Sequence, residues 1–390
     1  MTNRIAYIGD DHQLWVMNID GTGRRAVTIA TQALGGWGSR AGVETNAWPC
    51  WSPNSRWLAC FRSTQGEDSG GPSSLHAIEV DGVEERVLAE LSGDLPIYSQ
   101  WSPDGSKVAI LAQSEDELTL QVCALADLGK KRLVDEGAPL FFSWVPATDG
   151  LLIHAGNKNG RPSRLMVRQP YHGEDCLYPS TPGSFCTPVF AGGRAFFVSS
   201  NGKAAVIQSC APDGSDLREH VAMDGLVALL SSPDGSQLAV AAAVGGEMTP
   251  YDGVYLLPLE GGELRRVVEE PLLAFFWEAD GGGLLHVSVD ARRQTLWWWR
   301  TRFDEGTSRR LAPFWPTREQ MFHLHFFEQY AGSHANLTAD GQTLIYCGHA
   351  DPRGPQAGES GPQVFALDLR QPSAPPLPIA AGSFAVAAPR

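Results

Sequence analysis

One short motif recurs along this chain of 390 residues and limits the folds that it can adopt. In its clearest copy, Trp101-Ser102-Pro103-Asp104-Gly105 precedes the apolar run Val108-Ala109-Ile110. An aromatic residue ends one strand, Pro-Asp-Gly reverses the chain, and a partly β-branched run begins the next strand. Asp-Gly readily adopts the positive φ angles of a tight turn, so the motif predicts an antiparallel hairpin.

Copies of this motif return along the whole chain with decreasing quality. We call the residue at the position of Trp101 the anchor of each copy. The anchors are Trp51, Trp101, Trp144, Phe190, Ser231, Trp277 and Leu337. They recur at intervals of roughly 40 to 60 residues, and a strand–turn–strand unit of about this period is typical of a β-propeller with four strands in each blade.

The two ends of the chain together supply one further copy. Residues 4–30 contain patterns for a second, third and fourth strand, whereas residues 384–390 resemble a first strand. Joined in one blade, the ends would leave no free sheet edge between them. The sequence therefore predicts an all-β domain over residues 1–390, an eight-bladed β-propeller of four-stranded antiparallel blades closed by the N- and C-terminal strands. Seven blades is the alternative, because the copy at Phe190 is the weakest.

Charge and apolar patterning restrict the partners of the chain. The formal net charge is −14, from 30 basic and 44 acidic residues, and no basic patch stands out. Such a chain repels phosphate groups, so neither nucleic acid nor an anionic membrane is an expected partner. No signal peptide is visible, and no apolar run reaches about 18 residues. We expect a cytoplasmic protein, or a periplasmic or secreted one if a leader has been removed.

The repeat has a family resemblance. The pattern W-S-P-D-G-x-x-aliphatic-A, together with strands of the type Met17-Asn18-Ile19-Asp20-Gly21-Thr22, resembles the TolB-type, WD40-like propeller repeat. Bacterial proteins with such repeats include TolB, the propeller domains of prolyl-oligopeptidase-like peptidases and oligogalacturonate lyases. The resemblance implies the fold and carries no activity by itself. The chain has no G-x-S-x-G motif, which marks the nucleophile of the peptidases' hydrolase domain.

An insertion at residues 313–333 interrupts the repeats and is the one place where a helix is expected. It contains His323 and His325, and His334 follows it directly. If residues 322–326 were extended, the first two histidines would point to the same side, as two ligands of one divalent metal ion would. Glu328 or His334 could supply a third ligand.

Oligogalacturonate lyases resemble this insertion in part, since they hold a divalent metal with a Q-x-x-H-x-H arrangement. Gln320, His323 and His325 have the same spacing, but eleven residues separate His325 from the anchor Leu337, whereas the lyase pair runs directly into the repeat turn. The simpler interpretation is an aromatic-rich insertion that packs on the propeller, with the histidines as polar tips.

The residues three positions before each anchor form a second set of candidates. On equivalent strands they would lie at one level around the central channel; they are Trp48, Tyr98, Phe141, Thr187, Ala228, Ala274, His334 and Phe384. Five of them are aromatic or histidine, which favours an aromatic-lined cup for a ligand. The alternative is that these side chains only fill the space between the blades.

We therefore expect a non-catalytic propeller that presents a site for a protein, a peptide or a small molecule at the channel mouth. The expected binding residues are Trp48, Tyr98, Phe141, His323, His325, Glu328, Tyr330 and His334. The alternative is a metal-dependent enzyme, similar to a polysaccharide lyase or a hydrolase, with a histidine cluster at 323–334. No cofactor is expected under the first hypothesis, and a divalent metal held by Gln320, His323, His325 and His334 under the second.

Overall fold

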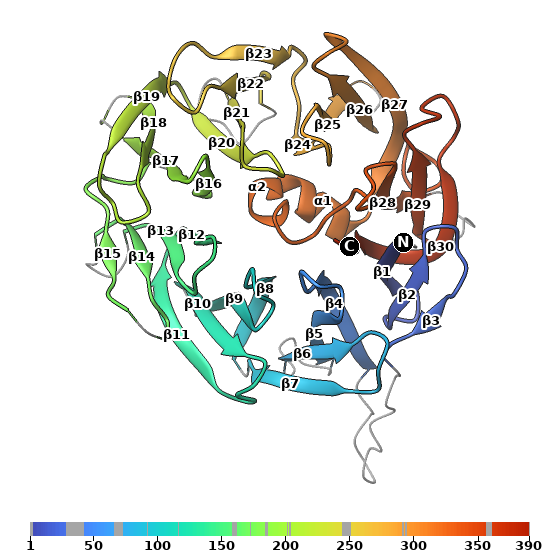
Figure 1. Cartoon of the computed structure of the whole chain (residues 1–390). Coiled ribbons are helices and arrows are strands. Elements are labelled where there is room, and N and C mark those ends of the chain that lie inside the picture. Colours follow the sequence, from blue (N-terminus) through green and yellow to red (C-terminus); the bar gives the residue numbers. More distant parts are fainter. Residues whose placement is uncertain are drawn as a thin grey trace. The chain divides into compact units, whose positions relative to one another are not determined.

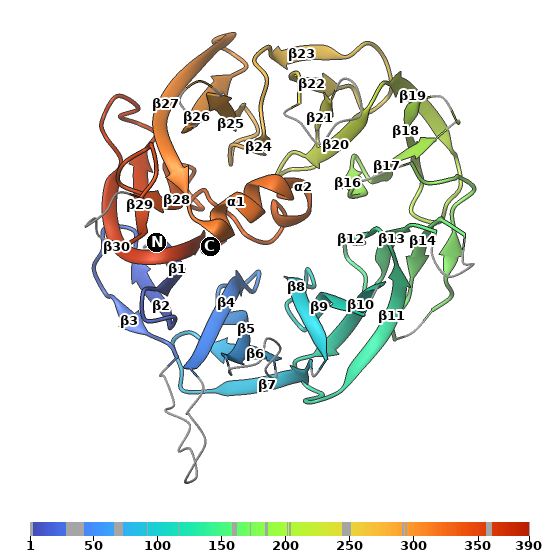
Figure 2. The ribbon, with the colours of Figure 1, turned by 180° about the vertical axis from the view of Figure 1, so that it is seen from behind.

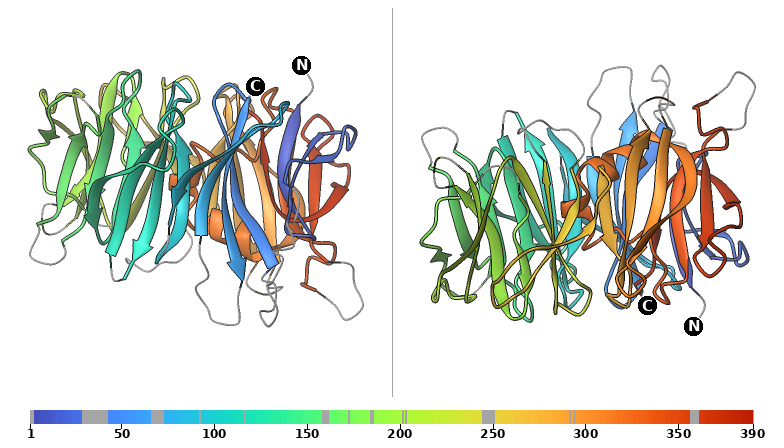
Figure 3. Two further views of the ribbon diagram at one scale, coloured as in Figure 1. Left: turned by 90° about the horizontal axis from the view of Figure 1, so that it is seen from below. Right: turned by 90° about the horizontal axis from the view of Figure 1, so that it is seen from above.

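The computed structural model of the chain describes residues 3–28, 43–65, 73–91, 93–115, 117–157, 162–171, 173–183, 186–200, 202, 204–243, 251–290, 292, 295–355 and 361–389. These residues form thirty β-strands and two short helices, labelled in Figure 1 and seen from behind in Figure 2. Figure 3 gives side views in which neighbouring strands of a sheet cross at an angle, as in any twisted sheet. The prediction of an all-β chain is confirmed.

The strands pair in the order that a propeller requires. Five sheets each contain four consecutive strands, and a sixth runs from β24 to β30 and continues with β1 to β3. Neighbouring strands pair antiparallel. This confirms a β-propeller of four-stranded antiparallel units. The repeat at Phe190 does form its own sheet, so the strand grouping is consistent with eight blades, although the blade number itself stays a prediction.

The chain divides into two compact units. Unit 1 comprises residues 1–133, 315–321 and 333–390, and unit 2 comprises residues 134–314 and 322–332. The strands that lie within unit 1 are β1 (Arg4–Gly9), β2 (Leu14–Asn18), β3 (Arg25–Ala26), β4 (Val43–Trp51), β5 (Trp57–Gln65), β6 (Ser73–Glu79), β7 (Glu85–Glu90), β8 (Asp94–Trp101), β9 (Lys107–Ser114), β10 (Glu117–Ala124), β28 (Thr343–His349), β29 (Gln363–Asp368) and β30 (Leu377–Ala387).

The strands within unit 2 are β12 (Leu140–Trp144), β13 (Leu151–Ala155), β14 (Arg164–Arg168), β15 (Cys176–Leu177), β16 (Val189–Ala191), β17 (Arg194–Ser200), β18 (Ala205–Cys210), β19 (Arg218–Met223), β20 (Leu226–Ser231), β21 (Leu238–Ala243), β22 (Val254–Leu257), β23 (Arg265–Val268), β24 (Ala274–Trp277), β25 (Gly283–Asp290) and β26 (Thr295–Arg302). Helix α2 (Phe327–Tyr330) also belongs to unit 2. Strand β11 (Lys131–Gly137), strand β27 (Thr307–Pro316) and helix α1 (Arg318–His325) each begin in one unit and end in the other.

The two ends of the chain meet in one sheet, as the sequence predicts. Strand β30 pairs with β29 through its first half and with β1 through its second half, where Ile8 lies opposite Phe384. Gly382 sits at the register shift between these halves, and a Cβ atom there would lie 2.5 Å from the carbonyl oxygen of Ile8. A glycine at this position therefore allows β30 to pair with both β29 and β1.

The recurring turn explains why the anchor is usually tryptophan. In the clearest copy, the Ser102 hydroxyl donates to Asp104 at 2.5 Å and accepts the backbone N–H of Lys107 at 3.0 Å, while Gly105 takes a φ of 71°. The indole N–H of Trp101 donates to the carbonyl oxygen of Cys50, one residue before the preceding anchor, at 3.0 Å. The anchor thus packs one sheet of the repeat on the sheet before it.

The same link recurs at other anchors. In unit 2, Trp277 donates to the carbonyl oxygen of Leu230, again one residue before the preceding anchor, at 3.1 Å. In unit 1, Trp51 donates to the carbonyl oxygen of Val386 at 3.3 Å.

Among the residues that the structure describes, no helix has the length and apolar character needed to cross a membrane.

Candidate functional site

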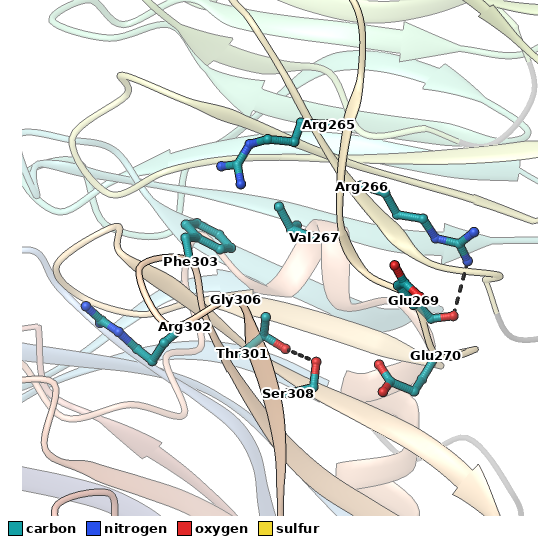
Figure 4. Close-up of a pocket in the computed structure, with 10 residues that line it drawn as sticks. All are labelled: Arg265, Arg266, Val267, Glu269, Glu270, Thr301, Arg302, Phe303, Gly306 and Ser308. Atoms are coloured by element: carbon teal, nitrogen blue, oxygen red, sulfur yellow. Dashed lines mark hydrogen bonds between the residues drawn. The ribbon is translucent and has the colours of Figure 1, made fainter.

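A depression that could hold a ligand lies in unit 2, and the sequence did not predict it. It has a volume of about 400 Å³ and lies between β23 and the turn that joins β26 to β27 (Figure 4). We call it the charged pocket, because its lining contains three arginines and two glutamates. The lining residues are Arg265, Arg266, Val267, Glu269, Glu270, Thr301, Arg302, Phe303, Gly306 and Ser308.

Two arginines of the charged pocket keep their positive charge available. The guanidinium of Arg265 lies 5.8 Å from the ring centre of Phe303. Arg266 donates through Nη2 to the backbone oxygen of Asp252 at 2.6 Å. It also donates to the backbone oxygen of Glu269 at 3.1 Å (Figure 4). Among the described residues, neither arginine forms a salt bridge with a carboxylate, so both can attract an anionic group.

The third arginine of the pocket has a structural role. Arg302 donates to Asp280 at 2.8 Å and to Glu278 at 2.7 Å through Nη1, and to Asp304 at 3.3 Å through Nε. These hydrogen bonds, above all the one to Asp280, raise the pKa of Arg302 above its ordinary value. Three carboxylates therefore balance its charge and hold the wall of the charged pocket in place.

Carboxylates occupy another part of the lining. Glu269 and Glu270 directly follow β23, and Figure 4 shows both carboxyl groups apart from the guanidinium of Arg265. The Oε2 atom of Glu270 is shielded from solvent and has no hydrogen-bond partner among the described residues. With Val267 and Phe303 as apolar lining, the charged pocket offers a cationic group, an anionic group and an apolar surface in one place.

A second, smaller cavity in unit 2 brings together three residues that the sequence singled out. It has a volume of about 50 Å³ and lies beside helix α2, so we call it the helix cavity. Its lining residues are Phe141, Leu226, Tyr251, His325, Phe326, Glu328 and Gln329. Of the predicted binding residues, Phe141, His325 and Glu328 are therefore neighbours.

Glu328 is the chemically unusual group of the helix cavity. Its Oε2 atom accepts the backbone N–H of Thr187 at 2.8 Å. Burial raises the pKa of Glu328 to about 8, although the hydrogen bonds from Thr187 and from the Cys186 thiol lower it. Burial, together with the nearby carboxyl, also raises the pKa of Cys186 well above its ordinary value. At neutral pH both groups are therefore mainly protonated and uncharged.

The expected pair of metal-binding histidines is not formed, because their segment is helical and not extended. Residues two apart on a helix point to nearly opposite sides. His323 is buried and stacks on Phe276 with the ring centres 5.4 Å apart, whereas His325 is exposed. Tyr330, another predicted binding residue, is buried with its ring centre 5.7 Å from that of His323.

A capping motif explains the helix and was present in the sequence. Thr317 precedes α1, and its hydroxyl accepts the backbone N–H of Gln320 at 3.0 Å. The pattern Thr317-x-x-Gln320 is the signature of a capping box, which marks the start of a helix. The Oε1 atom of Gln320 accepts the backbone N–H of Cys347 at 2.9 Å and is buried, so this side chain supports the fold.

The metal hypothesis therefore loses its geometric basis. Over the described part of the chain, no group of three or more His, Cys, Asp or Glu side chains is placed to hold a metal ion. The expectation that the chain has no cofactor stays a prediction.

The remaining predicted residues gather in unit 1. The ring centre of His334 lies 6.2 Å from that of Trp48 and 5.8 Å from that of Tyr98, and Trp48 packs on Phe384 at 4.8 Å. The Ser333 hydroxyl links Tyr98 Oη at 2.9 Å to His334 Nδ1 at 2.8 Å. Residues three positions before their anchors thus do pack together here, and a ligand role for them stays a prediction.

Comparisons with known proteins agree with the repeat resemblance. No family model matches the chain. A putative tricorn protease homolog of Streptomyces coelicolor is 26% identical over 272 residues, which cover 62% of this chain and 20% of the relative. The Tol-Pal system protein TolB of Rhizorhabdus wittichii is 34% identical over 97 residues, covering 25% of this chain and 18% of that protein.

Among solved structures, a prolyl endopeptidase matches with a TM-score of 0.56 at 15% identity, covering 88% of this chain and 50% of its own. This likeness shows the fold. The chain spans about a fifth of the length of the two curated relatives named above. The expectation of a purely non-catalytic binding propeller is wrong, because the sequence relatives include a tricorn protease homolog and thus indicate a peptidase context.

Proposed function

Since this chain is a TolB-like β-propeller, we propose that it takes part in peptide hydrolysis, by holding a peptide segment for a peptide-cleaving catalytic part. The tricorn protease homolog among its relatives supports the peptidase context. The observation that carries the proposal is the charged pocket of unit 2, with its guanidinium groups, carboxyl groups and apolar surface. The bond-breaking step is assigned to a separate part, because the sequence has no G-x-S-x-G motif.

The charged pocket suits a peptide better than a uniformly charged ligand. Its volume of about 400 Å³ falls within the ordinary range for ligand sites, about 300–1,000 Å³. A peptide segment can place an acidic side chain at Arg265, a basic group at Glu270 and an apolar side chain on Phe303. Since the two charges have opposite sign, the pocket would favour segments that carry both.

Fluorescence polarisation with labelled peptides tests this proposal. We expect the wild-type chain to bind a peptide of the pattern acidic–apolar–basic, and to bind less well a peptide of the same length that carries only acidic or only basic residues. Arg265→Gln and Glu270→Gln should each weaken binding by about tenfold, the loss of one charge-assisted contact. Arg370→Gln is the matched control, because Arg370 is an exposed arginine of unit 1 that pairs with Asp368.

Equal binding by the control and by both pocket variants would contradict the placement of the peptide in the charged pocket. No binding of any peptide by the wild-type chain would contradict the proposed function itself.

A further inference from the structure

We infer that the helix cavity of unit 2 is a binding site for a single primary ammonium group. This inference goes beyond the proposed function, because it concerns another site and rests only on the residues around Glu328. Three features support it: the aromatic lining, the lack of a cationic partner for the Glu328 carboxyl group within the described part of the chain, and the small volume of the cavity.

Three aromatic rings line part of the helix cavity. Phe141, Tyr251 and Phe326 contribute their rings, and Leu226 adds an apolar side chain. Tyr251 packs edge-on against Phe327 with the ring centres 5.9 Å apart, so its ring is held by helix α2. Aromatic rings attract cations through their negative faces, and this attraction is strongest where water is excluded.

Among the residues that the structure describes, no cation lies beside the Glu328 carboxyl group. Its hydrogen-bond partners are the backbone N–H of Thr187 and the thiol of Cys186, both neutral donors. No lysine or arginine lines the helix cavity. The titratable groups that face Glu328 are Tyr251, Cys186 and the exposed His325. The carboxyl group therefore keeps its proton until a cation arrives.

An ammonium group would supply the missing charge. On binding, the O–H bond of the Glu328 carboxyl group breaks, its proton passes to water, and the resulting carboxylate accepts an N–H of the ammonium. Burial that raises the pKa of Glu328 to about 8 makes this proton release measurable near neutral pH.

The size of the cavity selects the ligand. The volume of about 50 Å³ exceeds the minimum that holds one water molecule, about 10–15 Å³, by roughly fourfold. It admits the head of a primary ammonium and excludes a quaternary one, so the rest of the ligand must lie outside. The ammonium could belong to the N-terminus of a peptide, to a lysine side chain or to a free alkylamine.

The test is calorimetric titration of the whole chain with methylammonium in phosphate buffer, with proton release followed separately in a pH-stat. We expect saturable binding that releases close to one proton per site at pH 7, and less as the pH rises through 8. Tetramethylammonium, which is larger and has no N–H donor, should not bind. Glu328→Gln should weaken methylammonium binding by at least about tenfold and abolish proton release.

Two controls keep the inference falsifiable. Glu305→Gln removes an exposed carboxylate of unit 2 and should change neither readout. Tyr251→Leu should weaken binding but preserve proton release by the bound fraction. This variant therefore separates the contribution of the aromatic ring to binding from that of the carboxyl group. Thermal unfolding of each variant shows whether it is folded.

Two further peptides then identify the source of the ammonium. A lysine-free peptide with a free N-terminus tests the α-amine, and an N-acetylated peptide with one lysine tests the side chain. Binding of either one with loss in Glu328→Gln supports the inference and assigns the source. Binding without proton release at pH 7, equal binding by Glu328→Gln, or no binding of any amine would overturn it. Because the charged pocket keeps its residues in all these variants, such a failure leaves the proposed function unaffected.

Discussion

Replacing the anchor Trp101 by alanine tests how the repeat holds unit 1 together. The side chain is 4% exposed and belongs to a buried cluster that includes Trp57 and Val108. Truncation of a buried tryptophan to alanine costs about 3–5 kcal/mol, because it removes apolar contacts and leaves a cavity. The indole N–H also bonds to the carbonyl oxygen of Cys50, so the expected loss lies in the upper part of this range.

Two further variants separate the contribution of the apolar contacts from that of the indole hydrogen bond. Trp101→Phe keeps most of the apolar surface but leaves the Cys50 carbonyl without its donor, which costs about 1–3 kcal/mol. Trp15→Ala is the control, because Trp15 is a half-buried tryptophan of unit 1 whose indole bonds to the exposed Asp11, and its loss should be smaller.

Urea unfolding followed by circular dichroism measures these losses through linear extrapolation. If the two units unfold in separate steps, the loss should appear in the step of unit 1. A loss below about 1 kcal/mol for Trp101→Ala would refute the assignment of the anchor as the link between successive sheets.

Three other changes have defined outcomes. Thr317→Ala should lower the free energy of unfolding by about 0.5–2 kcal/mol in urea, because the cap on the N–H of Gln320 is lost; an unchanged value would contradict the N-cap role of Thr317. Gly382→Ala should lower the melting temperature, since its Cβ would lie 2.5 Å from the Ile8 oxygen, and unaltered melting would show that β30 does not need the glycine. Glu328 has a folded-state pKa raised to about 8 from an ordinary 4.5, so the folded state binds its proton more tightly. The wild type should therefore lose stability as the pH rises from 4.5 through 8, whereas Glu328→Gln should lose less; parallel pH profiles would contradict a protonated carboxyl group in the folded state.

The fold could be predicted because its signal is local and repeated. Each Asp-Gly turn, such as Asp104-Gly105, fixes a hairpin through a few neighbouring atoms, and the repetition of that hairpin identifies the propeller. The pairing of the chain ends followed from the same pattern, since residues 384–387 carry the missing first strand that lies beside β1.

A helix was expected in the insertion at residues 313–333 and is present there, but its extension over the two histidines was missed. The two histidines of the insertion suggested an extended segment, whereas Thr317 and Gln320 already marked a helix start. The backbone conformation of this segment decides whether the two side chains can bind one metal ion. His323 and His325 share a side on a strand but lie on nearly opposite sides of a helix. The paired-histidine geometry on which the metal hypothesis rested is absent for this one reason.

The charged pocket could not be predicted from the sequence. Its two walls come from residues 265–270 and 301–308, which lie in different sheet segments and read separately as ordinary strand ends. Packing decides whether an arginine is balanced by carboxylates, as Arg302 is, or has no carboxylate partner among the described residues, as is the case for Arg265. The raised pKa of Glu328 likewise follows from burial, which no local pattern encodes.

The most direct test of the central claim is the rate of peptide hydrolysis in extracts of the source organism with and without this chain. The gene is deleted, and the wild-type chain or the double variant Arg265→Gln/Glu270→Gln is expressed in its place at an equal level. The account predicts that deletion slows cleavage of peptides of the pattern acidic–apolar–basic, that the wild type restores the rate and that the double variant does not. Equal cleavage rates in all of these extracts would contradict a role for this propeller in peptide hydrolysis.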